Sequence, residues 1–262
     1  MPHSPRKRFG QHFLHDQSII AHILAAMHPQ PHQHWVEIGP GQGALTIPML
    51  KKIQQLDAIE LDRDLIISLQ AQCVPWGILH LYNADALAFD FAQLKRDNQP
   101  LHIFGNLPYN ISTPLLFHLL TFATDIASMH FMLQKEVADR LAAKSGTANY
   151  GRLSVMMQYH CQADYLLDVP AHCFTPPPKV ASSVIRLTPY ASLPYPCHQY
   201  SLLELVVKHA FGQRRKTLRN SLREFIDDAT WQALPIDSSL RAEALTPKDF
   251  VMLVNALSGI KS

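Results

Sequence analysis

Short apolar runs alternate with helical stretches between residues 34 and 133, and this alternation constrains the fold more than any other feature of the chain. Stretches 44–54 and 64–73 have helical character and fall between the runs. Parallel strands need a long crossover connection, commonly a helix, so the pattern predicts an α/β fold with a mostly parallel sheet and helices on both faces. The five predicted strands are 34–39, 56–61, 78–83, 101–105 and 128–133.

The second half of the chain changes character. Two further strand candidates, 164–169 and 182–188, follow each other without an obvious helix, which predicts an antiparallel edge to the sheet. Beyond the prolines near residue 195 the pattern is helical only, so we place a domain boundary near residue 190. The chain is thus expected to form a domain over 1–190 and a small all-helical domain over 191–262. Thr246 and Pro247 form a helix-start signal, and the apolar stripe after it, Phe250, Leu253, Val254 and Leu257, is interpreted as the small domain's core.

Composition limits the class of protein. Hydrophobic residues make up 47% of the chain and charged residues 17%, which supports a sizeable core and excludes a disordered chain, a collagen and a small disulfide scaffold. The net charge is only +2, so any affinity for nucleic acid must come from a local patch. We find no apolar core of a signal peptide and no apolar stretch long enough to span a membrane, and we expect a cytoplasmic protein.

Cysteines and histidines give no indication of a metal site. The four cysteines, Cys73, Cys161, Cys173 and Cys197, form no Cys-x-x-Cys pair and are interpreted as reduced thiols. The densest histidine run, His28, His32 and His34, falls in a Pro/Gln-rich stretch without nearby carboxylates and is interpreted as a solvated loop. We therefore expect no metal ligands in this chain.

A glycine-rich turn follows the first predicted strand, in Glu37-Ile-Gly39-Pro-Gly41-Gln-Gly43. Such a turn lets a ligand approach the backbone and the start of the next helix. The third glycine comes one residue earlier than in the dinucleotide pattern, and an acidic residue precedes the turn, so a phosphate ligand fits less well. Glu60 ends the second strand, where a carboxylate can accept both ribose hydroxyls, and Asp85 follows the third strand, where it can accept from an adenine amine. Together these residues predict an adenosine-containing cofactor.

The fourth predicted strand ends in Asn106-Leu-Pro108-Tyr109, at the sheet edge where ligands bind. The lone pair of an adenine amino group is delocalised into the ring, so methylation there requires acceptors for its hydrogens rather than a strong base. The Asn106 side-chain oxygen and the Pro108 carbonyl can serve as those acceptors and free the lone pair for a methyl donor. Tyr109 offers an aromatic face for an extruded base, although a core tyrosine in an ordinary turn remains an alternative.

A second aromatic residue, Phe174, begins the stiff run Phe174-Thr-Pro-Pro-Pro-Lys179. An extended proline run can hold a side chain in place, so Phe174 is a candidate for the opposite wall of a base sandwich. A core phenylalanine beside a rigid loop is the alternative interpretation.

Between residues 208 and 223 the sequence contains basic residues and no acidic ones. Arg215, Arg219 and Arg223 recur at every fourth position, which predicts one cationic helix face opposite an apolar face of Leu218, Leu222 and Phe225. Such a helix suits a phosphate backbone, and the basic arm 6–8 could add to the same surface. The six basic residues are Lys208, Arg214, Arg215, Lys216, Arg219 and Arg223.

With these residues the sequence resembles the small-subunit (16S) ribosomal RNA adenine dimethyltransferase family over nearly its whole length. The resemblance implies a Rossmann-like class I methyltransferase sheet plus a small helical domain, and S-adenosylmethionine as methyl donor. It also implies dimethylation at N6 of two adjacent adenosines near the 3′ end of small-subunit rRNA, within the 30S particle. The motifs that carry it are Gly10–Leu14, EIGPGQGALT at 37–46, Glu60, Asp85, NLPYNIS at 106–112, FTPPPKVASS at 174–183 and FGQRRKTLRN at 211–220.

The resemblance also assigns site residues. The target base is expected against Asn106, Pro108, Tyr109 and Phe174, and the cofactor against His12, Leu14, Gly39, Glu60, Asp85 and Asn106. Many relatives have Asn at the position of His12, so a side-chain contact there departs from the family pattern. We expect a monomer that contacts no membrane.

Two other functions remain open from the sequence. The glycine turn alone is compatible with an NAD-linked oxidoreductase, although the shifted third glycine and the Asn-Leu-Pro-Tyr turn argue against it. A non-catalytic ribosome-assembly binder could retain the fold, but such a protein needs none of Glu60, Asp85 and Asn106.

Overall fold

The computed structural model describes residues 12–96, 99–213 and 215–259, which belong to two compact units. The first unit contains the chain up to Ala138 together with Asp164–Pro189. The second contains Asp139–Ala163 and the chain from Tyr190 onward. The later break coincides with the boundary expected near 190. Segment 139–163, expected in the first domain, instead joins the second unit because its helix α6 (Arg152–His160) packs against α7 (Tyr200–Gly212) and α10 (Pro247–Gly259).

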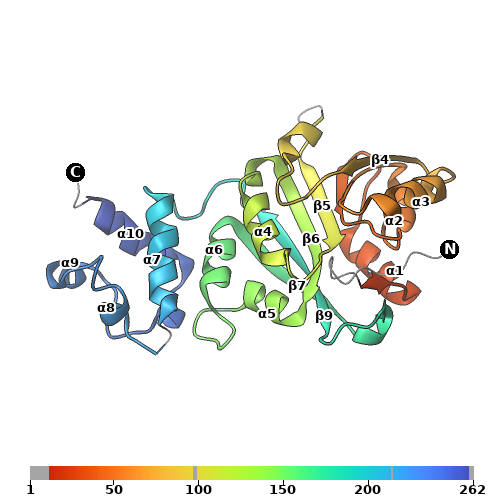
Figure 1. Cartoon of the computed structure of the whole chain (residues 1–262). Helices are drawn as coiled ribbons and strands as arrows, with labels where there is room; N and C mark the ends of the chain where they lie inside the picture. The colour runs from red at the N-terminus through yellow and green to blue at the C-terminus, as the bar shows by residue number, and fades with distance from the viewer. Residues whose placement is uncertain (1–11, 97–98, 214, 260–262) are drawn as a thin grey trace. The chain divides into compact units, whose positions relative to one another are not determined.

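A seven-stranded sheet forms the centre of the first unit (Figure 1). Its strand order is β4-β3-β2-β5-β6-β9-β7; the first five of these run parallel, and β9 runs antiparallel to β6. The predicted mostly parallel sheet with an antiparallel edge is confirmed. The strands are β2 (His34–Ile38), β3 (Gln55–Glu60), β4 (Ile78–Asn83), β5 (Leu101–Asn106), β6 (Ile126–Gln134), β7 (Cys161–Val169) and β9 (Ser182–Pro189).

Helices connect the parallel strands as the sequence predicted. The stretch 44–54 forms α2 (Thr46–Ile53) and the stretch 64–73 forms α3 (Arg63–Cys73). Asp62 caps α3 through a bond from the Asp64 backbone N–H. Helix α3 packs on β4 and against α2, at the β4 end of the sheet (Figure 1). The remaining elements before residue 143 are α1 (Gln17–Met27), η2 (Phe91–Leu94), α4 (Ser112–Leu120), η3 (Ala123–Asp125) and α5 (Lys135–Ala142).

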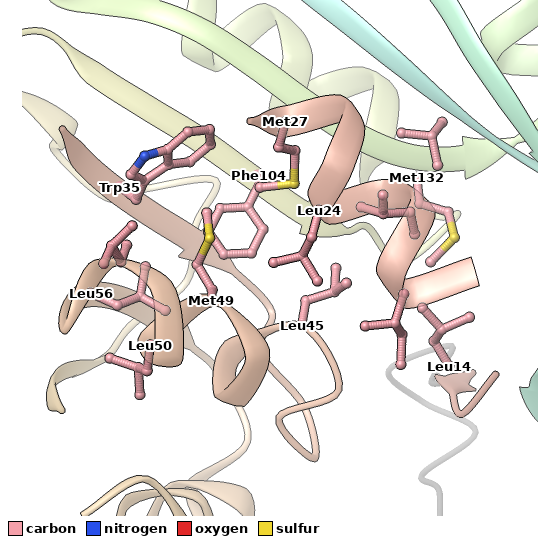
Figure 2. Packing of buried hydrophobic residues seen from close by; sticks show 14 of the residues in the cluster. Leu14, Leu24, Met27, Trp35, Leu45, Met49, Leu50, Leu56, Phe104 and Met132 are labelled. Carbon is pink, nitrogen blue, oxygen red and sulfur yellow. The ribbon is translucent and has the colours of Figure 1, made fainter. Parts of the chain in front are cut away.

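One face of the sheet packs under α1, α2 and α3. Trp35, Phe104 and Met132 come from neighbouring strands and lie in one buried cluster with Leu24 of α1 and Met49 of α2 (Figure 2). Each of these side chains is at most 5% exposed. Because burial of apolar area is the main favourable contribution to folding, this cluster fixes where the carboxyl ends of the strands lie.

A short two-stranded ribbon brings the start of the described chain onto the first unit. Strand β1 (Phe13–Leu14) pairs antiparallel with β8 (Phe174–Thr175), with Phe13 opposite Thr175 and Leu14 opposite Phe174. The turn η4 (Ala171–Cys173) precedes β8, and its Cys173 carbonyl accepts from the His15 backbone N–H at 3.0 Å. This ribbon was not predicted, because its two strands are too short to show a period.

His34 corrects one prediction from the histidine run. It is the first residue of β2, only 10% of its side chain is exposed, and its ring contacts the buried Asp57 carboxylate. Arg96 binds the same carboxylate at 2.9 Å. Buried carboxylates need such partners, so His34 belongs to an internal charge network rather than to a solvated loop.

The second unit is helical, as expected. It contains α6, α7, α8 (Leu218–Ser221), α9 (Asp228–Ala233), η5 (Ala242–Ala244) and α10. The interpretation of the stripe 250–257 as a core is confirmed, because Phe250, Leu253 and Val254 are fully buried. The predicted start of α10 is also confirmed: Thr246 and Asp249 exchange backbone-to-side-chain bonds in a capping box. In the part of the chain that is described, no helix is long and apolar enough to cross a bilayer.

The prediction that Arg215, Arg219 and Arg223 share one cationic helix face is wrong, because α8 covers only Leu218–Ser221. Helix α7 ends at Gly212, and α8 starts only at Leu218. The backbone N–H groups of Leu218 and Arg219 donate to Leu240 and Ser238 rather than to the preceding turn, so a new helix begins there. Leu218 and Leu222 are nevertheless buried, as the apolar pattern predicted.

Candidate active site

A cavity of about 300 Å³ lies in the first unit where β2, β3, β4 and β5 end. This is the edge of a parallel sheet at which ligands bind in α/β folds, and the volume is at the lower end of the range for small-molecule sites. The predicted residues His12, Leu14, Gly39, Glu60, Asp85, Asn106, Pro108 and Tyr109 all line it. The cavity therefore brings together every predicted cofactor residue and three of the four predicted base-contacting residues.

The glycine turn lines the floor of the cavity with backbone. Gly39 and Gly41 have φ values of +69° and +58°, a left-handed conformation that side chains disfavour. A Cβ on Gly41 would also lie 3.3 Å from a ring carbon of Phe13. The Gly39 N–H donates to the Ile59 carbonyl at 2.9 Å, which ties the turn to β3. The turn is therefore a fixed surface that a ligand can approach closely.

Glu60 is held in place by two backbone donors. The N–H of Gly41 donates to its Oε2 at 3.1 Å and the N–H of Asp62 donates to its Oε1 at 2.8 Å. Burial raises the pKa of Glu60, while these two bonds oppose that rise. Each carboxylate oxygen keeps acceptor capacity beyond its one backbone bond, as recognition of a ribose diol requires.

Asp85 is exposed and accepts from the Leu87 N–H at 2.9 Å. This bond fixes its carboxylate beside the cavity, just beyond β4.

Glu37 is a third carboxyl in the same cavity, and the prediction did not assign it a role. It is 2% exposed, and no donor reaches its Oε2 atom within the described residues. Burial raises the pKa of Glu37 to about 8; the Thr46 side chain opposes this rise, and the nearby Glu60 carboxylate adds to it. An unpaired buried carboxyl oxygen costs free energy, so this atom is suited to a ligand that carries a hydrogen-bond donor.

The charge of the cavity lining discriminates between cofactor classes. Glu37, Glu60 and Asp85 contribute carboxyls, whereas the described lining contains neither Lys nor Arg. A pyrophosphate would meet like charge here, while a cationic ligand would not. The lining therefore disfavours the NAD-linked alternative that the glycine turn left open.

Asn106 is oriented by a bond from its amide nitrogen. Its Nδ2 donates to the His12 carbonyl at 2.9 Å, which leaves Oδ1 as the accepting end of the amide. The Pro108 carbonyl accepts from the Ile111 N–H at 3.2 Å, and a carbonyl has a second lone pair for another donor. Both predicted acceptors thus line the cavity, one on each side of Leu107.

Tyr109 is fixed at both ends. Its hydroxyl group is 2.7 Å from the Ser182 Oγ of β9, and its ring stacks on His12 with centroids 5.6 Å apart. Partial burial raises the pKa of the Tyr109 phenol, so it stays neutral. The His12 Nδ1 atom is 2.8 Å from the Pro176 carbonyl, and this bond ties His12 to the proline run. A tyrosine that forms one wall of the cavity is not the core residue that the alternative interpretation described.

Phe174 does not occupy its expected position. The ring is 2% exposed, belongs to the buried cluster with Leu14 and Met132, and does not line the cavity. The pairing of β8 with β1 turns it inward, opposite Leu14. The core alternative describes this phenylalanine correctly, and the ring that stacks on Tyr109 is His12.

The predicted cationic residues lie in the second unit. Lys208, Arg215, Lys216, Arg219 and Arg223 are exposed, and three of them line a shallow hollow of about 410 Å³: Lys208, Lys216 and Arg223. The Arg219 guanidinium pairs with the Asp228 carboxylate. Arg214 and the arm 6–8 lie outside the described residues.

Some site residues were missed by the sequence reasoning. Phe13 contacts the glycine turn and Ser182 contacts Tyr109, and both come from segments whose partners are far away in the sequence. No local pattern marks them. Glu37 was noticed only as an acid before the turn, although its position at the end of a buried strand could have indicated a cavity residue.

Comparison with known proteins identifies the family. The model of the ribosomal RNA adenine dimethylase family matches residues 2–258. The chain is 53% identical to ribosomal RNA small subunit methyltransferase A of Laribacter hongkongensis, covering 97% of this chain and 96% of that protein. It is 51% identical to the protein of the same name from Pseudomonas putida, covering 98% and 96%.

Solved structures agree on the fold. A dimethyladenosine transferase from Plasmodium falciparum superposes with a TM-score of 0.77 at 23% identity, covering 92% of this chain and 96% of that one. The 23S rRNA methyltransferase ErmE superposes with a TM-score of 0.72 at 24% identity, covering 94% and 99%. Because the family model spans nearly the whole sequence and relatives exceed half identity, this chain belongs to the ribosomal RNA adenine dimethylase family.

Proposed function

We propose that this protein transfers methyl groups from S-adenosylmethionine to N6 of two adjacent adenosines near the 3′ end of small-subunit rRNA, within the 30S particle. The observation that carries the proposal is the orientation of Asn106. Because its amide nitrogen donates to the His12 carbonyl, its amide oxygen remains available as an acceptor. The names of the close relatives support the small subunit as the source of the substrate.

The residues of the cavity fit S-adenosylmethionine. Glu60 would accept the ribose hydroxyls, Asp85 the adenine amine, and the bare backbone of Gly39 would leave room for the ligand. The unpaired Glu37 Oε2 offers an acceptor to an ammonium group. When bound, the cofactor supplies an electrophilic methyl group on a sulfonium. The carboxylates of Glu60 and Asp85 favour a cationic ligand electrostatically over an anionic one.

The chain's own residues act by position and hydrogen bonding. Asn106 Oδ1 and the Pro108 carbonyl would accept hydrogen bonds from the two N–H groups of the target amine and draw its nitrogen toward tetrahedral geometry, which localises the lone pair on nitrogen. The methylated nitrogen would then lose one proton to water. Tyr109 would stack on the extruded base. Pro108 has a fixed φ, and the Leu107 N–H donates to the Met132 carbonyl at 3.1 Å. The turn 106–109 therefore does not have to rearrange to present the Asn106 Oδ1 and Pro108 carbonyl acceptors.

The cationic residues of the second unit would bind the phosphate backbone. Lys208, Arg215, Lys216 and Arg223 are exposed on turns and helix ends, where long side chains can follow an irregular RNA surface. In this proposal the first unit performs the chemistry and the second anchors the rRNA. The protein acts as a cytoplasmic monomer.

Labelled S-adenosylmethionine and undermethylated small subunits test the proposal directly. We expect label on two neighbouring adenosines, located by primer extension on the extracted rRNA, and S-adenosylmethionine binding that NADH does not compete with. The Asn106→Ala variant, assayed in parallel, should bind subunits but label them poorly. Label on large-subunit rRNA only, or labelling that survives in the variant, would contradict the assignment.

A further inference from the structure

Three potential metal ligands meet beside the β1–β8 ribbon, outside the cofactor cavity. They are Asp16, His172 and Cys173, and one ligand atom from each lies within 4.8 Å of the other two. Among residues 12–96, 99–213 and 215–259, this is the one group of three such side chains that meets this distance. None of the three lines the cavity that holds the predicted cofactor site.

The backbone holds the two segments that carry these ligands together. Leu14 lies opposite Phe174 in the ribbon, and the His15 N–H donates to the Cys173 carbonyl at 3.0 Å. Asp16 is the residue after His15, and His172 precedes Cys173. The side chains are therefore brought together by a bonded ladder rather than by chance contact of mobile groups. The two segments are far apart in the sequence, which explains why the sequence predicted no metal site.

Each side chain is available to a cation. Asp16 caps α1 through Oδ1, which accepts from the Ile19 N–H at 3.0 Å, and its carboxylate also accepts from the Cys173 thiol, so a cation would take the place of that thiol proton. Cys173 is 1% exposed and forms no disulfide, whereas His172 is exposed. Zinc binds sulfur at about 2.3 Å and nitrogen or oxygen at about 2.0–2.2 Å, which places tetrahedral ligands roughly 3.5 Å apart. The three ligand atoms, which lie within 4.8 Å of one another, would approach further when the ion binds.

The donor set selects the type of ion. A thiol, an imidazole and a carboxylate suit Zn²⁺, whereas Mg²⁺ and Ca²⁺ prefer oxygen ligands only. The positive end of α1 by itself disfavours a cation, but a thiolate and the Asp16 carboxylate together offset both charges of the ion. We propose that Asp16, His172 and Cys173 bind Zn²⁺ with a water molecule as the fourth ligand.

Binding forms a zinc–sulfur bond in place of the S–H bond of Cys173 and releases that proton to water, with no change of oxidation state. The ion joins the start of α1 to the turn before β8. It thereby fixes the segment that carries His12, Phe13 and Leu14, three residues of the cavity wall. The site is structural, and it stands whether or not the proposed methyl transfer is correct.

Chelator-treated full-length protein, titrated with Zn²⁺ by calorimetry, tests the site. We expect one ion per chain and a higher thermal unfolding midpoint in its presence. Replacing Zn²⁺ with Co²⁺ should give the absorption of a thiolate–cobalt bond. His172→Ala should weaken binding by at least about 100-fold, more than the loss expected for residues that only orient a ligand, and should not affect folding because the side chain is exposed. Cys173→Ala should remove the cobalt–thiolate absorption.

Matched controls separate a metal site from a helix cap. Asp16→Asn keeps a good capping residue but loses the charge, so it should weaken Zn²⁺ binding while the metal-free unfolding midpoint stays near that of the parent. Cys197→Ala and His15→Ala, which change another thiol and a neighbouring exposed imidazole, should bind Zn²⁺ like the parent. Unchanged binding in His172→Ala, loss of binding in His15→Ala, or no cobalt–thiolate absorption would overturn the proposal.

Discussion

The cofactor cavity of the first unit and the cationic segment 208–223 of the second are held in different ways. In the cavity, functional side chains are fixed by backbone groups: two N–H groups hold Glu60, and a carbonyl holds the Asn106 amide. In the segment, the cations project from turns and helix ends, and Arg219 pairs with Asp228, which is more exposed than Arg219 itself. A pre-organised site concentrates its free energy in a few groups, whereas a phosphate-binding surface distributes it over many.

The largest effect is expected where the cavity is most constrained. Asn106→Ala removes one acceptor that is already aimed, and we expect kcat to fall by about 10²-fold or more. Steady-state methylation of small subunits measures this, with the thermal unfolding midpoint as a check on the fold. Retained turnover would show that residues 106–109 do not carry the chemistry. The cavity would then not depend on a few constrained groups any more than the cationic segment does.

Glu60→Gln tests whether the backbone donors hold a functional carboxylate. The amide retains one acceptor but presents a donor to one of the two N–H groups. A hydrogen bond to a charged group contributes about 1.5–3 kcal/mol, so S-adenosylmethionine binding should weaken roughly 10- to 100-fold. Calorimetric titration gives the dissociation constant. An unchanged constant would place the ribose elsewhere.

Tyr109→Ala should affect the two methylation steps unequally. After the first transfer only one N–H remains, so one acceptor loses its partner and the second step depends more on stacking. Stacking contributes roughly 1–3 kcal/mol per base, so we expect the second methylation to lose about tenfold more rate than the first. Mass spectrometry of the RNA separates monomethyl from dimethyl product. Equal loss of both would contradict this.

Single changes in the cationic segment should have small and additive effects. Arg215→Ala should lower the slope of log affinity against log salt by about 0.7–0.9, the value for one phosphate contact. Arg219→Ala should lower it less, since Asp228 already neutralises that side chain. Filter binding of rRNA fragments over a range of salt concentrations measures both. Equal slopes in the parent and in a variant that combines Arg215→Ala with Arg219→Ala would show that the segment does not contact the RNA.

The smallest expected effect concerns stability and pH. The pKa of Glu37 is raised to about 8 in the folded protein from 4.5 in the unfolded chain, so the folded state binds more protons between these values. Stability therefore decreases as pH rises through that range. Without cofactor, Glu37→Gln should come close to the parent's unfolding midpoint at pH 5 and exceed it at pH 8. Scanning calorimetry measures the difference, and a constant difference at both values would show that Glu37 is not buried as a neutral acid.

Features set by strand order were predictable from the sequence. All seven strands of the central sheet were located, because apolar runs of strand length flanked by turns are local patterns. Glu60, Asp85 and Asn106 each follow from a strand end, since the ends of parallel strands meet at one edge. Those residues line one cavity, as expected.

Features set by distant backbone partners were not predictable. Phe174 turned inward because β1 pairs with β8, and the helix face expected from Arg215 to Arg223 is interrupted because the Leu240 and Ser238 carbonyls accept from the N–H groups of Leu218 and Arg219. A period of four in the basic residues identified exposed positions but could not show where the helix ends. The same limitation hid Asp16, His172 and Cys173 as neighbours.

The β1–β8 ribbon also determines when, during synthesis of the chain, the cavity wall can be completed. Phe13 and Leu14 belong to the cavity wall, but their strand partner is residues 174–175. A nascent chain that has left the ribosome only as far as β6 contains the glycine turn, Glu60, Asp85 and Asn106, yet it still lacks the strand β8 that pairs with its first strand. The growing chain gains a complete binding pocket only after two-thirds of it has been translated.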